Sequence, residues 1–306
     1  MFCDGAKTVK ELKSERIKEL GGYDAYKVPI LHVQTIAKQF AVDAVQGGKF
    51  KDVYVACSEQ NKGLANSIIC GVTDVINRHG RAIVLEDDLL TSPFFLKYMN
   101  NGLDYYQNRL SVYSISGYNY PPQKMVIPKD YEYDTYVSLR FCSWGWATWN
   151  DRWNQIDWST EFYADLFKHS HQMEAFNRGG DDLSNMLYLQ KEGRIDSWAI
   201  RCAYNQFVNH AVTIYPCISY IDNIGLDGTG VHCGNMKNSK YQDIIEKAKA
   251  EPCYVDVLYE DSRLINALYN VYTRTKRTTL QRLFHATFRK LGLPAPYEIK
   301  KKVYND

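Results

Sequence analysis

Three consecutive acidic residues, Glu86, Asp87 and Asp88, follow the short apolar run 81–85. Adjacent carboxylates disfavour one another's charge, so such a cluster is costly unless a cation or hydrogen bonds compensate it. A divalent ion such as Mn²⁺ or Mg²⁺ binds a few carboxylate oxygens and keeps other positions for water and phosphate. Such an ion also stabilises the charge on a leaving diphosphate. The triplet therefore predicts either a metal and phosphate site or, as the plainer alternative, an acidic turn.

The segments around the triplet are typical of a strand–helix–strand unit. Residues 51–57 alternate as a strand does, residues 63–78 have helical periodicity, and residues 81–85 form a short apolar strand. In parallel α/β sheets, ligands bind beyond the carboxyl ends of the strands. The triplet stands at such an end. A helix over 94–110 and a strand over 112–116 are expected next.

The remaining chain extends this pattern without a repeat or a low-complexity linker. Residues 7–46 and 159–192 are predicted to be mainly helical, and short strands are expected near 211–221. We therefore predict one α/β domain over 1–240, with a mixed, mainly parallel sheet flanked by helices. Residues 241–306 are expected to form a helical, basic tail.

Composition is that of an ordinary folded chain. Of the 306 residues, 45% are hydrophobic and 24% are charged, and the net charge of +2 gives no reason to expect a nucleic-acid partner. Eight scattered cysteines without metal-type spacing suggest buried free thiols in a reducing compartment. No apolar run approaches the ~18 residues that span a bilayer. A cytoplasmic location is the resulting expectation.

The C-terminal tail has an amphipathic pattern. An apolar stripe is flanked by basic residues at helical spacing, which predicts either contact with an anionic membrane surface or packing on the chain's own domain. The stripe consists of Leu280, Leu283, Phe284 and Phe288, and the basic residues are Arg274, Lys276, Arg277, Arg282, Arg289 and Lys290.

Several motifs, taken in order, resemble the nucleotide-binding part of GT-A glycosyltransferases. The first is Asn61-Lys-Gly-Leu-Ala-Asn-Ser67, and the second is Ile83-Val-Leu-Glu-Asp-Asp-Leu89 followed by Ser92-Pro-Phe-Phe95. The second is similar to the inverting N-acetylglucosaminyltransferase I family. Ser143-Trp-Gly-Trp-Ala-Thr-Trp149 is similar to a group of bacterial glycosyltransferase-like proteins. The resemblance covers residues 1–235 and continues through Gly179-Gly-Asp-Asp182 and Ser219–His232.

The resemblance implies a GT-A fold and a role for each matching residue. Asp88 would hold Mn²⁺ or Mg²⁺ with His232, while Glu86 and Asp87 would orient the sugar or the metal's waters. The other donor-site residues would be Asp4, Asn61 and Gly63, with Asp4 meeting the base of the nucleotide. Asp181 or Asp182 would be the general base. The acceptor would stack on Trp144, Trp146 and Trp198.

Each role has a plainer alternative. The pair Asp181-Asp182 could cap a helix that begins near Leu183, His232 could be an exposed loop residue, and the tryptophans could be core residues. The family ordinarily has one strand before the segment that matches Cys3-Asp4-Gly5, and this sequence lacks that strand.

The implied function is metal-dependent transfer of a sugar, with inversion, from a nucleoside diphosphate to a glycan or lipid-linked glycan, and the resemblance implies UDP as the nucleotide. Bacterial surface polysaccharide assembly would use such a reaction. The alternatives are a non-catalytic glycan-binding or scaffold relative, which the absent strand favours, and a sugar nucleotidyltransferase. The nucleotidyltransferase would need a glycine-rich phosphate loop that the sequence does not contain.

Overall fold

The computed structural model describes residues 1–306 except 13, 160, 228–244, 257–259 and 274–306. The described chain divides into two compact units. The first contains Met1–His79 with Asp196–Trp198, and the second contains Gly80–Ile195 with the described part of Ala199–Asp306. We describe each unit by itself.

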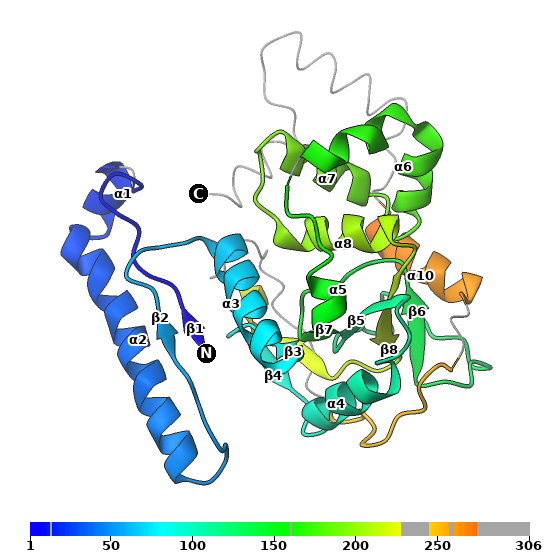
Figure 1. Cartoon of the computed structure of the whole chain (residues 1–306), viewed down its shortest axis with the longest axis horizontal. Helices are drawn as coiled ribbons and strands as arrows, with labels where there is room; N and C mark the ends of the chain where they lie inside the picture. The colour runs from blue at the N-terminus through cyan, green and yellow to red at the C-terminus, as the bar shows by residue number, and fades with distance from the viewer. Residues whose placement is uncertain (13, 160, 228–244, 257–259, 274–306) are drawn as a thin grey trace. The chain divides into compact units, whose positions relative to one another are not determined.

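The first unit combines two short strands with helices. Strand β1 (Phe2–Cys3) pairs in parallel with β2 (Ala56–Cys57), so Phe2 lies opposite Ala56 and Cys3 opposite Cys57. Beside β1 runs the long helix α2, visible in Figure 1, which buries Gln34, Ala37, Ala41 and Ala44. The predicted helical character of residues 7–46 is confirmed, including its end before Gly47. The helices of this unit are α1 (Ser14–Glu19), α2 (Tyr23–Gln46) and α3 (Leu64–His79).

The main sheet of the second unit has the strand order β3-β7-β5-β8-β6. Only β5 and β8 run parallel, and the other neighbouring pairs are antiparallel. Every residue of β5, β6, β7 and β8 is buried. The strands are β3 (Arg81–Val84), β5 (Val112–Ser116), β6 (Thr135–Ser138), β7 (Trp146–Trp149) and β8 (Val212–Pro216).

This topology confirms a mixed α/β fold and corrects two finer predictions. The sheet is mixed, as predicted, but mainly antiparallel rather than mainly parallel, because β7 enters between β3 and β5 and runs against both, and β6 runs against β8. The predicted parallel strand–helix–strand unit is wrong, because β2 pairs with β1 whereas β3 pairs with β7. The structure therefore bears out the α/β class and leaves the GT-A fold as an expectation.

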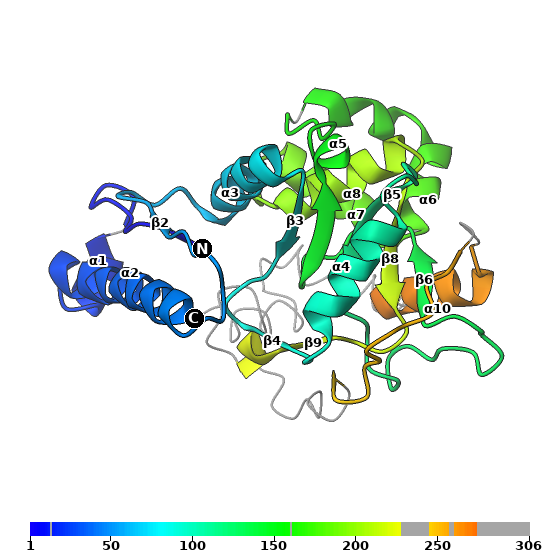
Figure 2. The same ribbon diagram turned by 60° about the horizontal axis from the view of Figure 1, so that its bottom comes forward.

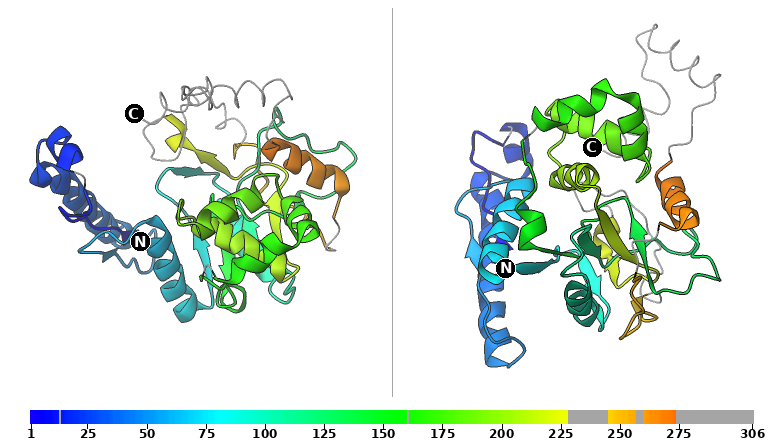
Figure 3. Two further views of the ribbon diagram at one scale, coloured as in Figure 1. Left: turned by 90° about the horizontal axis from the view of Figure 1, so that it is seen from above. Right: turned by 45° about the vertical axis from the view of Figure 1, so that its right-hand side comes forward.

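Helices flank this sheet. Figures 1 and 3 show α4 on one side of it and the group α6, α7 and α8 on the other. A separate antiparallel pair, β4 (Leu89–Thr91) with β9 (Ile221–Asn223), follows the acidic triplet and is seen in Figure 2. The helical segments are α4 (Phe95–Tyr105), α5 (Asn150–Trp153), η1 (Glu161–Lys168), α6 (Ser170–Asn177), α7 (Leu183–Lys191), α8 (Trp198–Val208), η2 (Ile224–Asp227) and α10 (Ser262–Tyr272).

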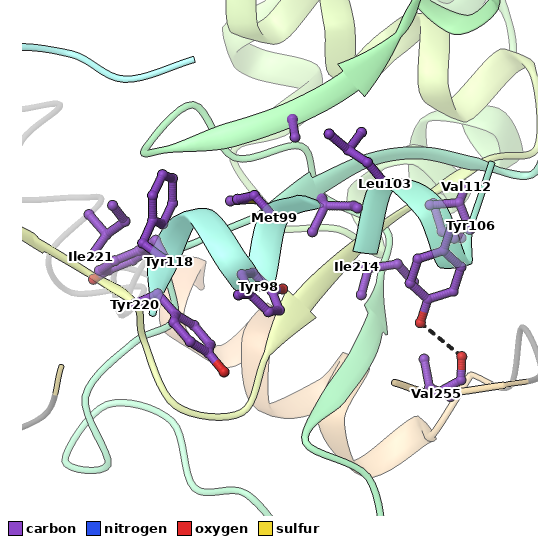
Figure 4. Packing of buried hydrophobic residues seen from close by; sticks show 14 of the residues in the cluster. Tyr98, Met99, Leu103, Tyr106, Val112, Tyr118, Ile214, Tyr220, Ile221 and Val255 are labelled. Atoms are coloured by element: carbon purple, nitrogen blue, oxygen red, sulfur yellow. Dashed lines mark hydrogen bonds between the residues drawn. The ribbon is translucent and has the colours of Figure 1, made fainter. Parts of the chain in front are cut away.

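Tyrosines form much of the core of the second unit. The ring of Tyr98 stacks on Tyr220 with centroids 4.2 Å apart, and its hydroxyl donates to the Ser116 carbonyl at 2.9 Å. Tyr106 similarly donates to the Val255 carbonyl at 2.8 Å, drawn as the dashed line in Figure 4. Buried tyrosines need such partners because an unpaired buried hydroxyl is costly. Part of the abundance of tyrosine in this chain thus reflects core packing.

Residues after 240 contribute to this core. On α10, Leu264, Ile265 and Leu268 are buried, and Leu264 and Leu268 pack with Tyr136 and Tyr215. The described part of the predicted tail therefore belongs to the second unit. The basic amphipathic stripe over 274–290 lies outside the described residues.

Two observations bear on the predictions about free cysteines and about membrane-spanning segments. The cysteines in the described part of the chain are free thiols, and they range from buried Cys202 to exposed Cys70 and Cys253. Among the described residues, no helix is both long enough and apolar enough to cross a bilayer.

Candidate functional site

The acidic triplet lies in the turn that joins β3 to β4. The turn is closed by the Leu89 N–H, which donates to the Glu86 carbonyl at 3.4 Å. Pairing of β4 with β9 places Leu89 opposite Asn223, and the Ile224 N–H donates to the Asp88 carbonyl at 2.9 Å. The turn is therefore held against the segment 223–225, which comes from much later in the sequence.

Burial and mutual repulsion make this turn electrostatically unfavourable for negative charge. Burial, followed by the charges of Asp88 and Asp87, raises the pKa of Glu86 from 4.5 to about 7. Burial and the Asp87 charge also raise the pKa of Asp88, although hydrogen bonds, one of them from Asn223, partly offset the effect. Within the described residues, the buried Asp88 Oδ1 has no hydrogen-bond partner. Such an orphaned oxygen is costly unless a ligand satisfies it.

A glycine allows Asp88 to approach the segment after β9. The Gly225 N–H donates to Asn223 Oδ1 at 2.8 Å, and a Cβ on Gly225 would lie 2.5 Å from Asp88 Oδ2. Real Cβ atoms do not approach an oxygen so closely, so a side chain here must displace the Asp88 carboxylate.

We expect Gly225→Ala to weaken metal-dependent nucleotide binding about tenfold, a change of ~1.4 kcal/mol. The melting temperature should stay near that of wild type, because the added methyl group presses on one flexible side chain. Titration calorimetry measures the first effect, and Ile224→Ala, at an exposed neighbouring position, is the matched control. Equal affinities of the two variants would contradict a role for Asp88 in binding.

The carboxyl groups of this turn fit a divalent cation shared with a phosphate. Mg²⁺ and Mn²⁺ sites for phosphate substrates often use one or two carboxylates and leave the other positions to water and phosphate oxygens. Asp88, with its orphaned oxygen, and Glu86 could supply those carboxylates. No group of three acidic, histidine or cysteine side chains in the described residues is arranged to hold a metal by itself.

The raised pKa of Glu86 makes stability depend on pH. Between pH 4.5 and 7 the folded chain binds a proton at Glu86 that the unfolded chain has released, so stability falls as pH rises through this window. With divalent ions chelated, Glu86→Gln should remove about 2 kcal/mol of this decline. Urea unfolding at pH 4.5 and pH 8 measures it. Parallel pH profiles for wild type and variant would refute the assignment.

In the first unit, the structure brings together three predicted donor-site residues, Asp4, Asn61 and Gly63. The carboxylate of Asp4 accepts from the Lys62 N–H at 2.8 Å and from the Gly63 N–H at 3.1 Å. Asn61 donates to the Gly5 carbonyl at 3.0 Å and accepts from Gly63 at 3.1 Å. Gly63 has a φ of +75°, which favours glycine. Asp4 thus satisfies the free N–H groups that precede α3.

A cavity of about 280 Å³ lies beside this loop. Besides Asp4 it is lined by Lys62 and Ser67, and by the paired strands β1 and β2. The Asp4 carboxylate therefore both fixes the loop and faces a cavity.

The two acids of the Gly-Gly-Asp-Asp motif have different environments. Asp182 is bound by both nitrogens of Arg140, at 2.8 and 3.0 Å, and the guanidinium lies over the Tyr272 ring at 3.4 Å. Asp182 occupies the N-cap position of α7 without a side-chain capping bond, so the simple capping alternative does not describe it. Asp181 instead lines an open cavity of about 400 Å³, together with Glu174, Arg178 and Tyr269 among others.

The tryptophans predicted to hold the acceptor are mostly core residues. Trp146 is 1% exposed and stacks on Trp153, and Trp198 is 3% exposed. Neither leaves a ring face for a sugar in this structure, so the core alternative describes both. Trp144 is only partly buried and packs edge-on against Tyr118. His232 lies outside the described residues.

Two residues near the candidate site had no role in the sequence analysis. Asn223 lies within the segment 219–225 that resembles the family, but its bond to Asp88 depends on the pairing of β4 with β9. Arg140 follows β6 in a stretch without a recognisable motif. No pattern in the neighbouring sequence indicates that Asn223 contacts Asp88 or that Arg140 contacts Asp182.

Comparison with known proteins assigns no family to the chain. No family model matches the chain, and no curated protein matches it. The resemblance to glycosyltransferases therefore rests on the motifs themselves.

Proposed function

We propose that the chain is a metal-dependent glycosyltransferase that moves a sugar from a nucleoside diphosphate to the hydroxyl of a glycan or lipid-linked glycan. The observation that carries the proposal is the partly buried turn Glu86–Asp88. The carboxyl groups of Glu86 and Asp88 have raised pKa values, and within the described residues the buried Asp88 Oδ1 lacks a partner. A turn that concentrates unsatisfied negative charge is suited to Mn²⁺ or Mg²⁺ with a diphosphate, whose leaving-group charge the ion would neutralise.

Each residue group has a defined task in the proposed reaction. Asp88 and Glu86 bind the cation at the diphosphate. Asn223 holds Asp88 by a hydrogen bond, and Gly225 leaves room for its carboxylate. UDP is the proposed nucleotide because the resembling family uses it.

Asp181, and not Asp182, is the proposed general base. The carboxylate of Asp182 is already held by the bidentate contact with Arg140, whereas Asp181 faces an open cavity. In the transfer step the acceptor oxygen bonds to the anomeric carbon as the bond from that carbon to the diphosphate oxygen breaks. The hydroxyl proton passes to Asp181, and the nucleoside diphosphate leaves with the bonding electrons. A single displacement of this kind inverts the anomeric centre.

The test of the proposal is release of nucleoside diphosphate from UDP-, GDP- and dTDP-sugars, with Mn²⁺ or with chelator, in the presence of simple glycans. The proposal expects release that needs both the metal and one nucleotide class. Binding of glycans without any nucleotide requirement would instead favour the non-catalytic alternative. Metal-dependent synthesis of a sugar nucleotide from a sugar phosphate and a nucleoside triphosphate would favour a nucleotidyltransferase.

A further inference from the structure

Two thiols of the first unit face each other across the β1–β2 pair. Cys3 and Cys57 are direct partners in the parallel register, so their side chains project from the same face of the two strands. Neighbouring strands lie about 4.8 Å apart, which falls within the ~4.4–6.8 Å between Cα atoms that a disulfide spans. The fold thus places these two cysteines at a distance that a disulfide can join.

The surroundings of the pair agree with close approach of the two sulfurs. Burial raises the pKa of the Cys3 thiol, and the neighbouring Cys57 thiol raises it further through charge and a hydrogen bond. Both cysteines are free and only partly buried. They line the same cavity of about 280 Å³ as Asp4, and a small oxidant can therefore reach them.

We propose that Cys3 and Cys57 are a site of oxidative modification, at which a peroxide converts the two thiols into a reversible disulfide between β1 and β2. One thiolate attacks a peroxide oxygen, the O–O bond breaks, and a sulfenic acid forms as the first water leaves. The second thiol attacks the sulfenic sulfur, forms the S–S bond and releases the second water. Two thiols and one hydrogen peroxide thus give one disulfide and two waters, and a dithiol reductant reverses the change.

The disulfide would fix the ends of β1 and β2 beside the cavity that both strands line. Cys3 directly precedes Asp4, and Cys57 directly precedes Ser58, whose carbonyl accepts from Gln34 together with that of Asp4. Cys70 lines the same cavity but lies on α3 and has no cross-strand partner in the register. It therefore serves as an internal comparison.

The test uses the whole chain, treated with increasing hydrogen peroxide, then alkylated and digested without reductant for mass spectrometry. We expect a peptide containing Cys3 linked to one containing Cys57, two hydrogens lighter than the separate peptides. The denatured protein should lose two of its eight thiols, and dithiothreitol should restore both. Cys70→Ser should form the same link, whereas Cys57→Ser should not.

Two results would overturn the proposal. One is a link from Cys3 or Cys57 to Cys70, or between chains, in place of the Cys3–Cys57 link. The other is stepwise oxidation to sulfinic acid with no link at any peroxide concentration. If the serine variants fail to fold, the peptide map of the wild type decides by itself. None of these results depends on whether the chain transfers sugars.

Discussion

Replacing Asp182 with alanine should lower the free energy of unfolding by about 3 kcal/mol. The substitution leaves the Arg140 guanidinium, whose side chain is 10% exposed, without its carboxylate partner. Breaking a buried ion pair from one side is costly because the remaining charge stays in a poorly solvated place. Urea or thermal unfolding measures the loss.

The double variant Arg140→Met with Asp182→Leu is the matched control. It removes both charges and keeps side-chain volume, so it should recover much of the stability that the single substitution loses. A single variant as stable as the wild type would show that the Arg140 contact contributes nothing. It would also reopen the choice between Asp181 and Asp182 as the base.

Replacing Asp181 with asparagine should reduce kcat by about 10²–10⁴-fold, the usual contribution of a positioned general base. Asparagine keeps the shape of the side chain but cannot take the acceptor proton. Stability should change by less than ~0.5 kcal/mol, because Asp181 is partly exposed. Initial rates of nucleoside diphosphate release measure the effect.

The controls for this second prediction separate catalysis from binding. Nucleotide affinity in the presence of Mn²⁺ should be the same in Asp181→Asn and wild type, since Asp181 is proposed to act on the acceptor. Glu174→Gln removes a different carboxylate from the same cavity and should leave kcat within a few-fold. A fall of kcat in both variants would point to the charge of the cavity and away from a base at Asp181.

Local patterns were sufficient for several elements of the fold. Helical periodicity predicted α3 and α4, and the apolar runs predicted β3 and β5. These segments carry their own signal because one face or both faces of each are buried.

Strands β6 and β7 were missed because their partners determine them. The four residues Trp146–Trp149 stand in an aromatic stretch with no clear alternation, and they become a strand by pairing with β3 and β5. Strand preference depends strongly on such packing. The same strand makes the mixed sheet mainly antiparallel, where a mainly parallel one was predicted.

In the candidate site, too, some features have a local sequence signal and others depend on contacts between distant segments. The acidic triplet was found from composition and position, because three adjacent carboxylates after an apolar strand are unusual. The hydrogen bond from Asn223 to Asp88, and the space that Gly225 leaves for the carboxylate, depend on the β4–β9 pair. The burial of Trp146 depends on strands β3 and β5, which pair with β7 on either side. Contacts between segments far apart in sequence leave no local pattern.

The most direct test of the account is thermal unfolding with UDP, GDP, dTDP and CMP, each with Mn²⁺ or with chelator, for wild type and Asp88→Ala. At a hundred times its dissociation constant, a ligand adds about 2.7 kcal/mol of stability. The account predicts that one nucleotide stabilises the wild type only with Mn²⁺ and does not stabilise Asp88→Ala. Stabilisation that persists without Asp88, or the absence of any shift in wild type, would contradict a metal–nucleotide site at this turn.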